Sequence, residues 1–280
     1  VMSVGRTMEE SLLKAVRSLE TGVCHIHHKK FDTWSNDELL DYIKDGTDDR
    51  LYAIAQLIRG GIDLVLIYNR TKIDMFFLEK FKNIIEFEAV VRANPMDVET
   101  LRAAKRMGFS DKFIGQLWGV SQHDMYLLRE KNGIFPVYKM IDTCASEFAS
   151  YVPYFYSTYE EENESVVSPK EKIIVLGSGP IRIGQGVEFD YSTVHAIWSI
   201  RAAGYEAIII NNNPETVSTD YTTSDKLYFE PLTVEDVMNV VHLEKPKAIV
   251  VSLGGQTAIN LAEPLSKLGV PIIGTDTEAI

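Results

Sequence analysis

Cysteine is scarce in this sequence, which has Cys24 and Cys144 among 280 residues. Two cysteines are too few for a disulfide framework, and they lack the paired spacing of a zinc site. We expect both to be ordinary buried thiols. His25, His27 and His28 stand next to Cys24, but no second cluster of ligand residues follows within a plausible turn. We therefore expect a polar surface loop there and no metal site.

Long apolar runs and an excess of basic charge are also missing. No run reaches the length of a membrane helix, and the opening residues VMSVGRTMEES lack the regions of a signal peptide. Lys and Arg number 28 against 40 Asp and Glu, a formal net charge of −12, which disfavours binding to a nucleic-acid backbone. We expect a cytoplasmic protein with no membrane and no nucleic-acid partner. Because the sequence begins without Met, we also expect a piece of a longer chain.

Apolar side chains recur at helical spacing through the first half of the sequence. Ser35 with Glu38 forms a predicted capping box, and Asn94-Pro95 breaks the longest pattern. The apolar segment 62–68 also suits a strand, but it stands among helices, and we predict helix. The predicted helices cover residues 8–19, 35–43, 48–58, 62–68, 71–93, 96–107, 110–117 and 121–132. The domain to about residue 148 is therefore predicted to be all-α.

Residues 110–132 also have the pattern of a helix-turn-helix. A helix that contacts DNA bases should bring net positive charge to the groove. In the second helix the two basic residues, Arg129 and Lys131, are offset in charge by two acidic residues, Asp124 and Glu130. We favour a helical hairpin packed in a bundle, and a DNA-binding regulator stays open as an alternative.

From residue 134 the pattern becomes extended, and a polar and aromatic stretch leads into acidic residues at 160–164. We predict a linker over 151–170. After Pro169 apolar runs alternate with helical patterns, which is typical of a mainly parallel sheet covered on both faces. The predicted strands cover 172–176, 206–211, 248–252 and 270–273, and the predicted helices cover 193–203, 233–243 and 257–268.

A glycine-rich turn joins the strand at 172–176 to the helix that follows it. Glycines in such a turn permit positive φ and a close approach of a ligand to the helix N-terminus. The dinucleotide pattern G-x-G-x-x-G fails because Arg182 stands at its third glycine, and the next strand ends in three asparagines, 211–213, rather than an acid. A nicotinamide-dependent enzyme is disfavoured and remains an alternative. The P-loop pattern also fails, since Gln185 and Gly186 replace its lysine and hydroxyl.

Polar side chains gather where the predicted strands end, at the edge where parallel sheets place their crevice. They are Arg182, Gln185, Glu188, Asn213, Glu215, Thr216, Gln256 and Thr257. No Ser-His-Asp order, metal cluster or reactive lysine is among them, and His195 is predicted to be packed in a helix, so we predict no catalytic residue. Glu188 and Glu215 suit either a general acid/base pair or surface carboxylates, and composition leaves both open.

Several blocks of the sequence resemble the carbamoyl-phosphate synthase large chain. GSGPIRIGQGVEFDYSTVHA, NNNPETVSTDYTTSDKLYFEPLTVEDV, KPKAIVVSLGGQTAINLA and GVPIIGT are similar, in order and spacing, to the start of its second synthetase half. FDTWSNDELLDYI and TKIDMFFLEKFKNIIEFE resemble its central helical domain, and VMSVGRTMEESLLKAVRSLE resembles the tail of its first half. Ser192 stands where the family often has cysteine. The resemblance covers essentially the whole chain.

The resemblance implies two domains, an all-α helical domain followed by a Rossmann-like α/β domain. Residues 1–22 would be the last helix of the first half, 23–150 the oligomerisation domain, 151–170 a linker, and 171–280 the domain that precedes the second ATP-grasp module. Six of the aromatic residues of the helical domain also indicate self-association, since exposed apolar area usually marks an interface. They are Phe76, Phe77, Phe81, Phe87, Trp118 and Tyr126.

The family makes carbamoyl phosphate from bicarbonate, glutamine-derived ammonia and two ATP, for arginine and pyrimidine synthesis. The resemblance therefore implies an ATP-dependent ligase with a glutaminase small subunit as partner and with Mg²⁺ (or Mn²⁺) and K⁺ as cofactors. The family's ATP and metal residues lie in ATP-grasp modules outside this stretch. We expect no ATP-binding, metal or catalytic residue here, and no activity from the isolated piece.

In this family carbamate travels from the first active site to the second through the protein interior. The resemblance implies that Arg182, Gly186, Glu188 and Glu215 line the far end of this conduit. Gly186 has no side chain to narrow a passage, and the two carboxylates offer acceptors to a neutral carbamic acid. They would repel a free anion, so either the intermediate passes protonated or Arg182 compensates.

Overall fold

The computed structural model describes residues 1–145, 147–148, 151–182 and 187–275. It divides the chain into two compact units. The sheet unit consists of Val1–Gly5, Arg17–Glu20 and Phe135–Ile280, and the helical unit consists of Arg6–Val16 and Thr21–Ile134. Each unit is described by itself.

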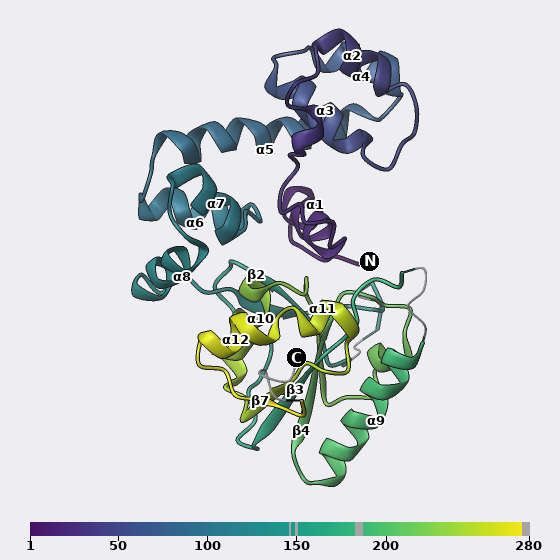
Figure 1. Cartoon of the computed structure of the whole chain (residues 1–280), viewed down its shortest axis with the longest axis vertical. Helices are drawn as coiled ribbons and strands as arrows, with labels where there is room; N and C mark the ends of the chain where they lie inside the picture. Colours follow the sequence, from purple (N-terminus) through teal and green to yellow (C-terminus); the bar gives the residue numbers. More distant parts are fainter. Residues whose placement is uncertain (146, 149–150, 183–186, 276–280) are drawn as a thin grey trace. The chain divides into compact units, whose positions relative to one another are not determined.

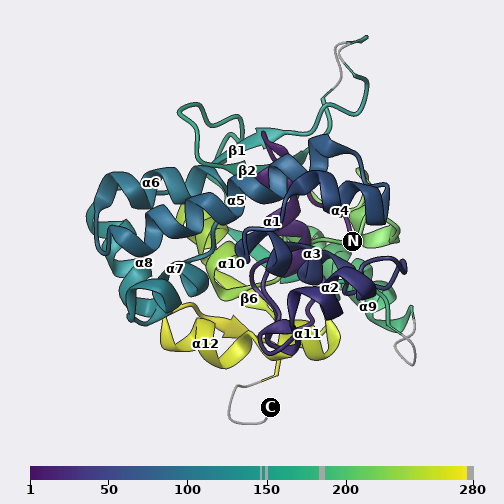
Figure 2. The same ribbon diagram turned by 90° about the horizontal axis from the view of Figure 1, so that it is seen from above.

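The first 133 residues form helices, as predicted. Those described are α1 (Met8–Ser18), α2 (Asn36–Tyr42), α3 (Arg50–Arg59), α4 (Leu64–Thr71), α5 (Met75–Ala93), α6 (Val98–Arg106), α7 (Asp111–Trp118) and α8 (Gln122–Lys131), with a short 3-10 turn, η1, at Lys29–Phe31. The ambiguous apolar segment 62–68 falls largely in α4, which confirms helix. The long α5 contacts α3, α4, α6 and α7 (Figure 2), so it is the central element of the helical unit.

Polar caps set the helix boundaries. Ser35 and Glu38 form the predicted capping box at the start of α2, and Ser121 with Asp124 forms a second one at the start of α8. Between α4 and α5, Lys72 is left-handed with φ 58° and ends α4. The predicted helix over 71–93 therefore begins later, at Met75, because Asp74 caps its amide groups.

The sheet has seven strands in the order β1-β2-β5-β4-β3-β6-β7. β1 pairs with β2 in antiparallel fashion and every other pairing among the described strands is parallel, which confirms a mainly parallel sheet. The strands are β1 (Val137–Met140), β2 (Tyr154–Thr158), β3 (Lys172–Leu176), β4 (Glu206–Asn211), β5 (Lys226–Phe229), β6 (Ala248–Val250) and β7 (Ile272–Ile273).

The structure differs from the sequence prediction at four places in this unit. The stretch to about residue 148, predicted to be all-α, contains β1, because residues 137–140 pair with β2. Residues 151–170, predicted as a linker, contain β2, because aromatic and β-branched side chains there pair with β1 and β5. β5 was absent from the predicted strands. The helix predicted over 257–268 is broken into α11 (Gly255–Ile259) and α12 (Ala262–Lys267), because the ring of Pro264 is incompatible with a continuous helix across residue 260.

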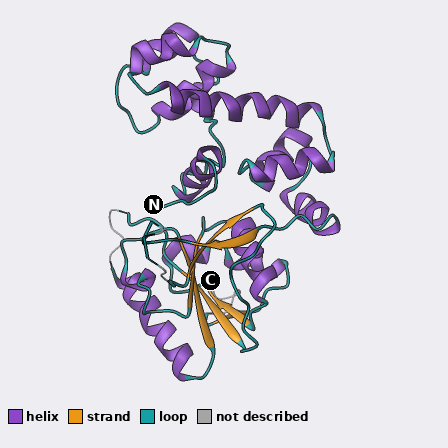
Figure 3. Cartoon of the chain, turned by 180° about the vertical axis from the view of Figure 1, so that it is seen from behind, coloured by secondary structure: helices purple, strands orange, loops and turns teal. Residues whose placement is uncertain are grey.

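Helices cover both faces of the sheet (Figures 1 and 3). On one face, α9 (Glu188–Ala202) packs Ile197 and Ile200 against Ile173, Val175 and Ile209. The alternate strand residues point to the opposite face, beside α10 (Val234–Glu244) and α12. Between these layers every residue of β3 and β4 is buried, which explains their continuous apolar runs.

The strand order fixes where a site can form. Along the chain, β4 and β5 are added on one side of β3, whereas β6 and β7 are added on its other side. The order thus reverses between β3 and β6. In open parallel sheets, ligands bind in the crevice at the carboxyl ends of the two strands that flank such a reversal.

Candidate site at the carboxyl edge of the sheet

The turns that follow β3 and β6 approach each other at this edge. A Cβ atom built on Gly254, after β6, would overlap the carbonyl oxygens of Leu176 and Gly177. Only glycine permits the two backbones to come so close. The turn after β3 therefore lies directly against the turn that leads into α11.

The glycines of the turn after β3 make room for the chain's own side chains. A Cβ on Gly177 would overlap Asn211, and a Cβ on Gly179 would overlap Oε1 of Glu20. Gly179 also has φ 67°. The side-chain oxygen Oδ1 of Asn211 accepts hydrogen bonds from the backbone amides of Gly179 at 3.1 Å and Asn212 at 2.9 Å. The last residue of β4 thus closes the glycine turn.

Glu20 connects three segments of the sheet unit that are far apart in sequence. Its Oε2 accepts hydrogen bonds from Arg182 Nη2 and from Thr257 Oγ1, each at 2.6 Å. These partners are 162 and 237 residues away along the chain. Sequence reasoning missed Glu20, because a glutamate at a helix end carries no local signal of so distant a partner.

The Glu20 carboxyl is electrostatically unfavourable in this position. Burial raises the pKa of Glu20 above its ordinary value, and the opposing hydrogen bond from Thr257 and charge of Arg182 do not cancel the effect. Its Oε1 is buried without a hydrogen-bond partner in the described structure. Three other buried polar atoms nearby also have no hydrogen-bond partner in the described structure: Ser18 Oγ, Asn211 Nδ2 and Asn212 Oδ1. The other side-chain atom of Asn212, Nδ2, donates to the Ser18 carbonyl at 3.3 Å. Unsatisfied polar atoms thus accumulate at this edge.

The predicted conduit residues occupy different places. Arg182 pairs with Glu20 and keeps 46% of its side chain exposed. Glu188 begins α9, Glu215 follows β4, and both side chains are exposed. Their segments are held together because Asp190 accepts hydrogen bonds from the amides of the short turn η2 (Val217–Thr219), at 2.9 and 3.1 Å. Gly186, with Gln185, lies outside the described residues.

The other polar residues predicted at the edge have local partners. Gln256 is exposed and donates to Asn260 at 2.6 Å, and Thr216 lies beside Ser218 and Thr219. His195 is exposed, which corrects the prediction that it is packed. It lies on the solvent side of α9, where its ring contacts Tyr191 and Trp198.

Two domain models from one enzyme family match the sequence. Residues 1–133 match the carbamoyl-phosphate synthetase large chain, oligomerisation domain. Residues 169–280 match the carbamoyl phosphate synthase preATP-grasp domain. The chain belongs to the carbamoyl-phosphate synthase large-chain family. The matched preATP-grasp domain includes β3 to β7, and the Glu20 carboxylate that reaches its glycine turn comes from the matched oligomerisation domain.

In this carbamoyl-phosphate synthase domain, the glycine turn is unsuited to a dinucleotide. Asn211 and Glu20 fill the space above Gly177 and Gly179, where a bound pyrophosphate would need to approach the backbone. A carboxylate at that point would also repel a diphosphate. Both observations argue against the nicotinamide-dependent alternative.

The helix-turn-helix alternative meets a similar obstacle in the carbamoyl-phosphate synthase oligomerisation domain. Arg129, one of the two basic residues at the end of α8, is 0% exposed. Its Nε donates to Asp111 at 2.8 Å and its Nη1 donates to the Ile134 carbonyl at 3.1 Å. Lys105 joins Asp111 at 3.1 Å. Arg129 therefore stabilises the α7–α8 hairpin, and because it is buried it is not available to contact DNA.

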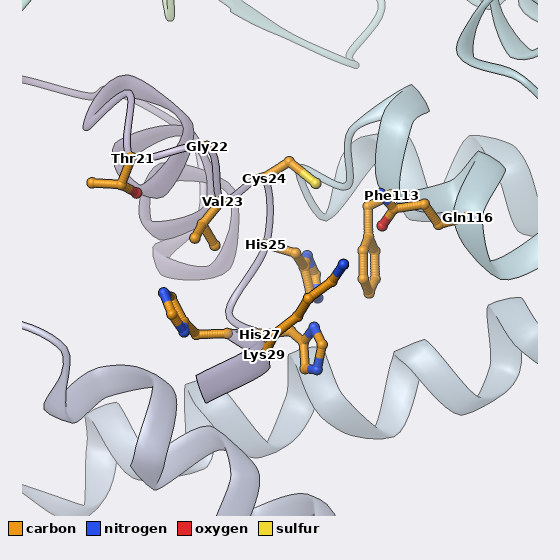
Figure 4. Close-up of a pocket in the computed structure, with 10 residues that line it drawn as sticks. Thr21, Gly22, Val23, Cys24, His25, His27, Lys29, Phe113 and Gln116 are labelled. Atoms are coloured by element: carbon orange, nitrogen blue, oxygen red, sulfur yellow. The ribbon is translucent and has the colours of Figure 1, made fainter. Parts of the chain in front are cut away.

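The same domain contains a cavity of about 270 Å³ beside η1 and α7 (Figure 4). It is lined by Thr21, Gly22, Val23, Cys24, His25, His27, His28, Lys29, Phe113 and Gln116. His25 is buried, stacks on Phe113 with ring centroids 3.7 Å apart, and has Nε2 3.0 Å from Glu88 Oε1. The predicted polar surface loop is therefore wrong for His25, because it has a buried acid as partner. Cys24 and Cys144 are partly exposed rather than buried.

The described ranges contain neither a group of metal ligands nor a helix suited to cross a membrane. No group of three or more His, Cys, Asp or Glu side chains there is placed to hold a metal ion. No helix in the same ranges combines the length and apolarity needed to cross a membrane.

Proposed function

We propose that this chain is the central part of a carbamoyl-phosphate synthase large chain, acting as scaffold, oligomerisation element and carbamate conduit. The observation that carries the proposal is the order of the two matched domains, oligomerisation before preATP-grasp, on one chain. The parent enzyme would make carbamoyl phosphate from bicarbonate, glutamine-derived ammonia and two ATP, for arginine and pyrimidine synthesis in the cytoplasm. A glutaminase small subunit would supply the ammonia.

The sheet unit supports a Rossmann-like assignment. Its parallel strands β3 to β7 follow the order β5-β4-β3-β6-β7, which is the strand order 3-2-1-4-5 of doubly wound nucleotide-binding folds. We infer that it is the domain preceding the second ATP-grasp module. The finer division of the sequence, with boundaries at residues 22, 150 and 170, remains a prediction.

ATP, Mg²⁺ or Mn²⁺, and K⁺ belong to the parent enzyme in this proposal. The described residues do not fit a metal site, since none of them form a group of three potential ligands. The family resemblance assigns the nucleotide and metals to ATP-grasp modules outside this stretch, and for that reason we expect the isolated chain to lack synthetase activity. In this proposal the chain supplies the residues that line the carbamate conduit.

The chemistry of the carboxyl edge is compatible with passage of a small carbamate. Arg182 presents a half-exposed guanidinium, which attracts an anion. The exposed Glu188 and Glu215 accept hydrogen bonds from a neutral carbamic acid and repel the ionised form. Such opposed charges favour transit over retention, because a molecule that binds tightly to a wall does not move on.

Self-association is supported by the face of α4 and α5. Val65, Leu66 and Tyr68 of α4 are exposed, as are Phe76 and Phe77 of α5. Exposed apolar area of this kind usually marks an interface. Phe81, which the sequence also places among the candidate contacts, is buried in the core. The candidate interface is therefore narrower than the aromatic composition predicts and includes aliphatic residues of α4.

The conduit is tested in the intact enzyme by changing its predicted wall. Gly186→Leu and, separately, Arg182→Gln should preserve bicarbonate-dependent ATP hydrolysis by the first half and ATP synthesis from carbamoyl phosphate and ADP by the second half. Net carbamoyl-phosphate formation should stop with Gly186→Leu and fall with Arg182→Gln. Glu263→Gln, at an exposed pair with Lys267, is the matched control. Loss of one half-reaction with retained coupling between the halves would show that these residues are structural.

A further inference from the structure

Glu20 has three properties that disfavour the folded state. Its backbone is left-handed, with φ 56°, a conformation that is strained for a residue with a side chain. Its Oε1 is buried without a partner in the described part of the chain. Its ionised carboxyl is desolvated, as the raised pKa indicates. Strain and desolvation gathered on one residue are typical of functional positions.

The contacts of Glu20 show what it does to Arg182. One oxygen, Oε2, accepts from both Arg182 and Thr257, while Oε1 lies where a Cβ of Gly179 would be. The carboxylate is thereby fixed between the turn after β3 and the start of α11. Because Thr257 is buried in α11, it anchors Glu20, and Glu20 in turn restrains the long, half-exposed side chain of Arg182.

We propose that Glu20 is the internal counterion of Arg182, a positioning residue that orients the guanidinium and partly neutralises it so that a small planar anion passes without being retained. This inference rests on the proposed conduit function. An uncompensated arginine binds carboxylates through two parallel hydrogen bonds. With Glu20 occupying Nη2, a passing carbamate meets a weaker and already ordered partner.

Charge and geometry both indicate that Glu20 weakens the affinity of Arg182 for an anion, rather than simply stabilising the fold. An exposed salt bridge contributes little to stability, and here the acid has been taken out of water, where pairing must first offset desolvation. A purely structural role would be served as well by a neutral side chain of the same shape. Glutamine at position 20 is therefore the informative replacement, since it keeps the volume and removes the charge.

The first experiment measures anion binding by the 280-residue chain itself. Acetate has the planar shape and charge of carbamate and is chemically stable. Its affinity is followed by NMR through the Arg182 Nε–H signal and the Gly179 amide. Glu20→Gln should bind acetate about tenfold more tightly than the unchanged chain, because the Glu20 carboxylate no longer competes with acetate for Arg182. A tenfold change in affinity corresponds to about 1.4 kcal/mol. Glu20→Gln combined with Arg182→Gln should lose this gain, and Glu263→Gln should change nothing.

Two outcomes would overturn the proposal. If Glu20→Gln leaves acetate affinity unchanged, Glu20 does not attenuate Arg182. If the gain persists in the double variant, the new affinity does not arise from Arg182. Thr257→Val provides a second variant should Glu20→Gln fold poorly, and it should raise acetate affinity in the same direction, by less, because Glu20 is then less firmly held.

The second experiment separates this inference from the proposed function. In the intact enzyme, Glu20→Gln should lower net carbamoyl-phosphate formation about tenfold while both half-reactions continue, and Arg182→Gln with Glu20→Gln should be no worse than Arg182→Gln alone. If Arg182→Gln uncouples the halves and Glu20→Gln does not, the counterion role fails and the conduit stands. If neither uncouples the halves although acetate binding behaves as expected, the conduit function fails.

Discussion

Glu244, in the last turn of α10, accepts a hydrogen bond of 2.6 Å from Lys226 on β5. Its second oxygen accepts one of 3.0 Å from Lys172 on β3, and Tyr228 donates to the same oxygen as Lys226. All four side chains are buried. Two strands and a helix are thus joined at the amino ends of the strands, on the opposite edge of the sheet from Glu20.

Replacing Glu244 should strongly destabilise the sheet unit. Glu244→Gln leaves the buried ammonium of Lys226 without its acid and leaves Lys172 with only Glu206, at 3.6 Å. Breaking a buried pair in this way costs about 3 to 5 kcal/mol. The free energy of unfolding, from urea titration followed by hydrogen exchange of β3 and β5, measures the loss. Glu263→Gln, at an exposed pair, should cost far less, because an exposed ion pair contributes little to stability. Similar losses in the two variants would contradict this interpretation of the buried network.

The helical unit should lose stability in acid through Glu88. Burial raises the pKa of Glu88, but hydrogen bonds from Arg59 and His25 and the charge of Arg59 outweigh it, and the pKa falls from 4.5 to about 2. A carboxyl whose pKa is depressed by folding stabilises the fold above its unfolded value, and this contribution disappears as pH falls through the folded value. The window therefore runs from about pH 4.5 down to about pH 2.

Hydrogen exchange of α5 amides between pH 5 and pH 2 measures this effect. The shift corresponds to roughly 3 kcal/mol, which Glu88→Gln should remove from the pH dependence while lowering stability at neutral pH. Glu86→Gln, at an exposed residue of the same helix paired with Lys82 at 3.5 Å, is the control. The attribution to Glu88 fails if Glu88→Gln keeps the full acid dependence.

Self-association should depend on the exposed face of α4 and α5. Phe76→Glu with Phe77→Glu places two charges on this face and should raise the dissociation constant of the self-associated chain at least about tenfold. Sedimentation velocity at several concentrations measures it. Trp198→Glu, at an exposed aromatic residue of α9, is the control. A strict monomer before any substitution would refute the proposal, as would association that survives the charged face.

Gly179→Ala should be more harmful than an alanine at another left-handed glycine. Both Gly179 and Gly204 have positive φ, at 67° and 89°, so both substitutions incur about 1 to 2 kcal/mol of backbone strain. At Gly204 no atom lies within 4 Å of the new Cβ, whereas at Gly179 it meets Glu20. Urea titration should show the larger loss for Gly179→Ala. Equal losses would mean that Glu20 moves aside without cost.

The sequence predicted those strands and helices whose position depends on neighbouring residues alone. β3 and β4 were predicted with the observed bounds, because continuous apolar runs ended by glycine or asparagine leave little ambiguity. The capping boxes at Ser35 and Ser121 mark helix starts in the same direct way. β2 and β5 were not predicted, since their mixed polar and aromatic residues become strands through pairing with β1, with β4 and with each other.

The site was harder to predict because its contacts span most of the chain. Arg182 was identified, but its partner Glu20 is 162 residues away. His25 was placed on the surface because its partner Glu88, 63 residues further on, is invisible to any local pattern. The roles of Gly186, Glu188 and Glu215 remain predictions.

The division of the first helix between the two units also has a consequence for how the protein is made. Residues 1–5 and 17–20 belong to the sheet unit, although residues 21–134 of the helical unit separate them from the strands. During synthesis the helical unit can therefore be complete before Thr257, the hydrogen-bond partner of Glu20 237 residues later, has been synthesised. Long-range closure of this kind folds slowly. The edge of the sheet should thus be among the last parts of the protein to form on the ribosome.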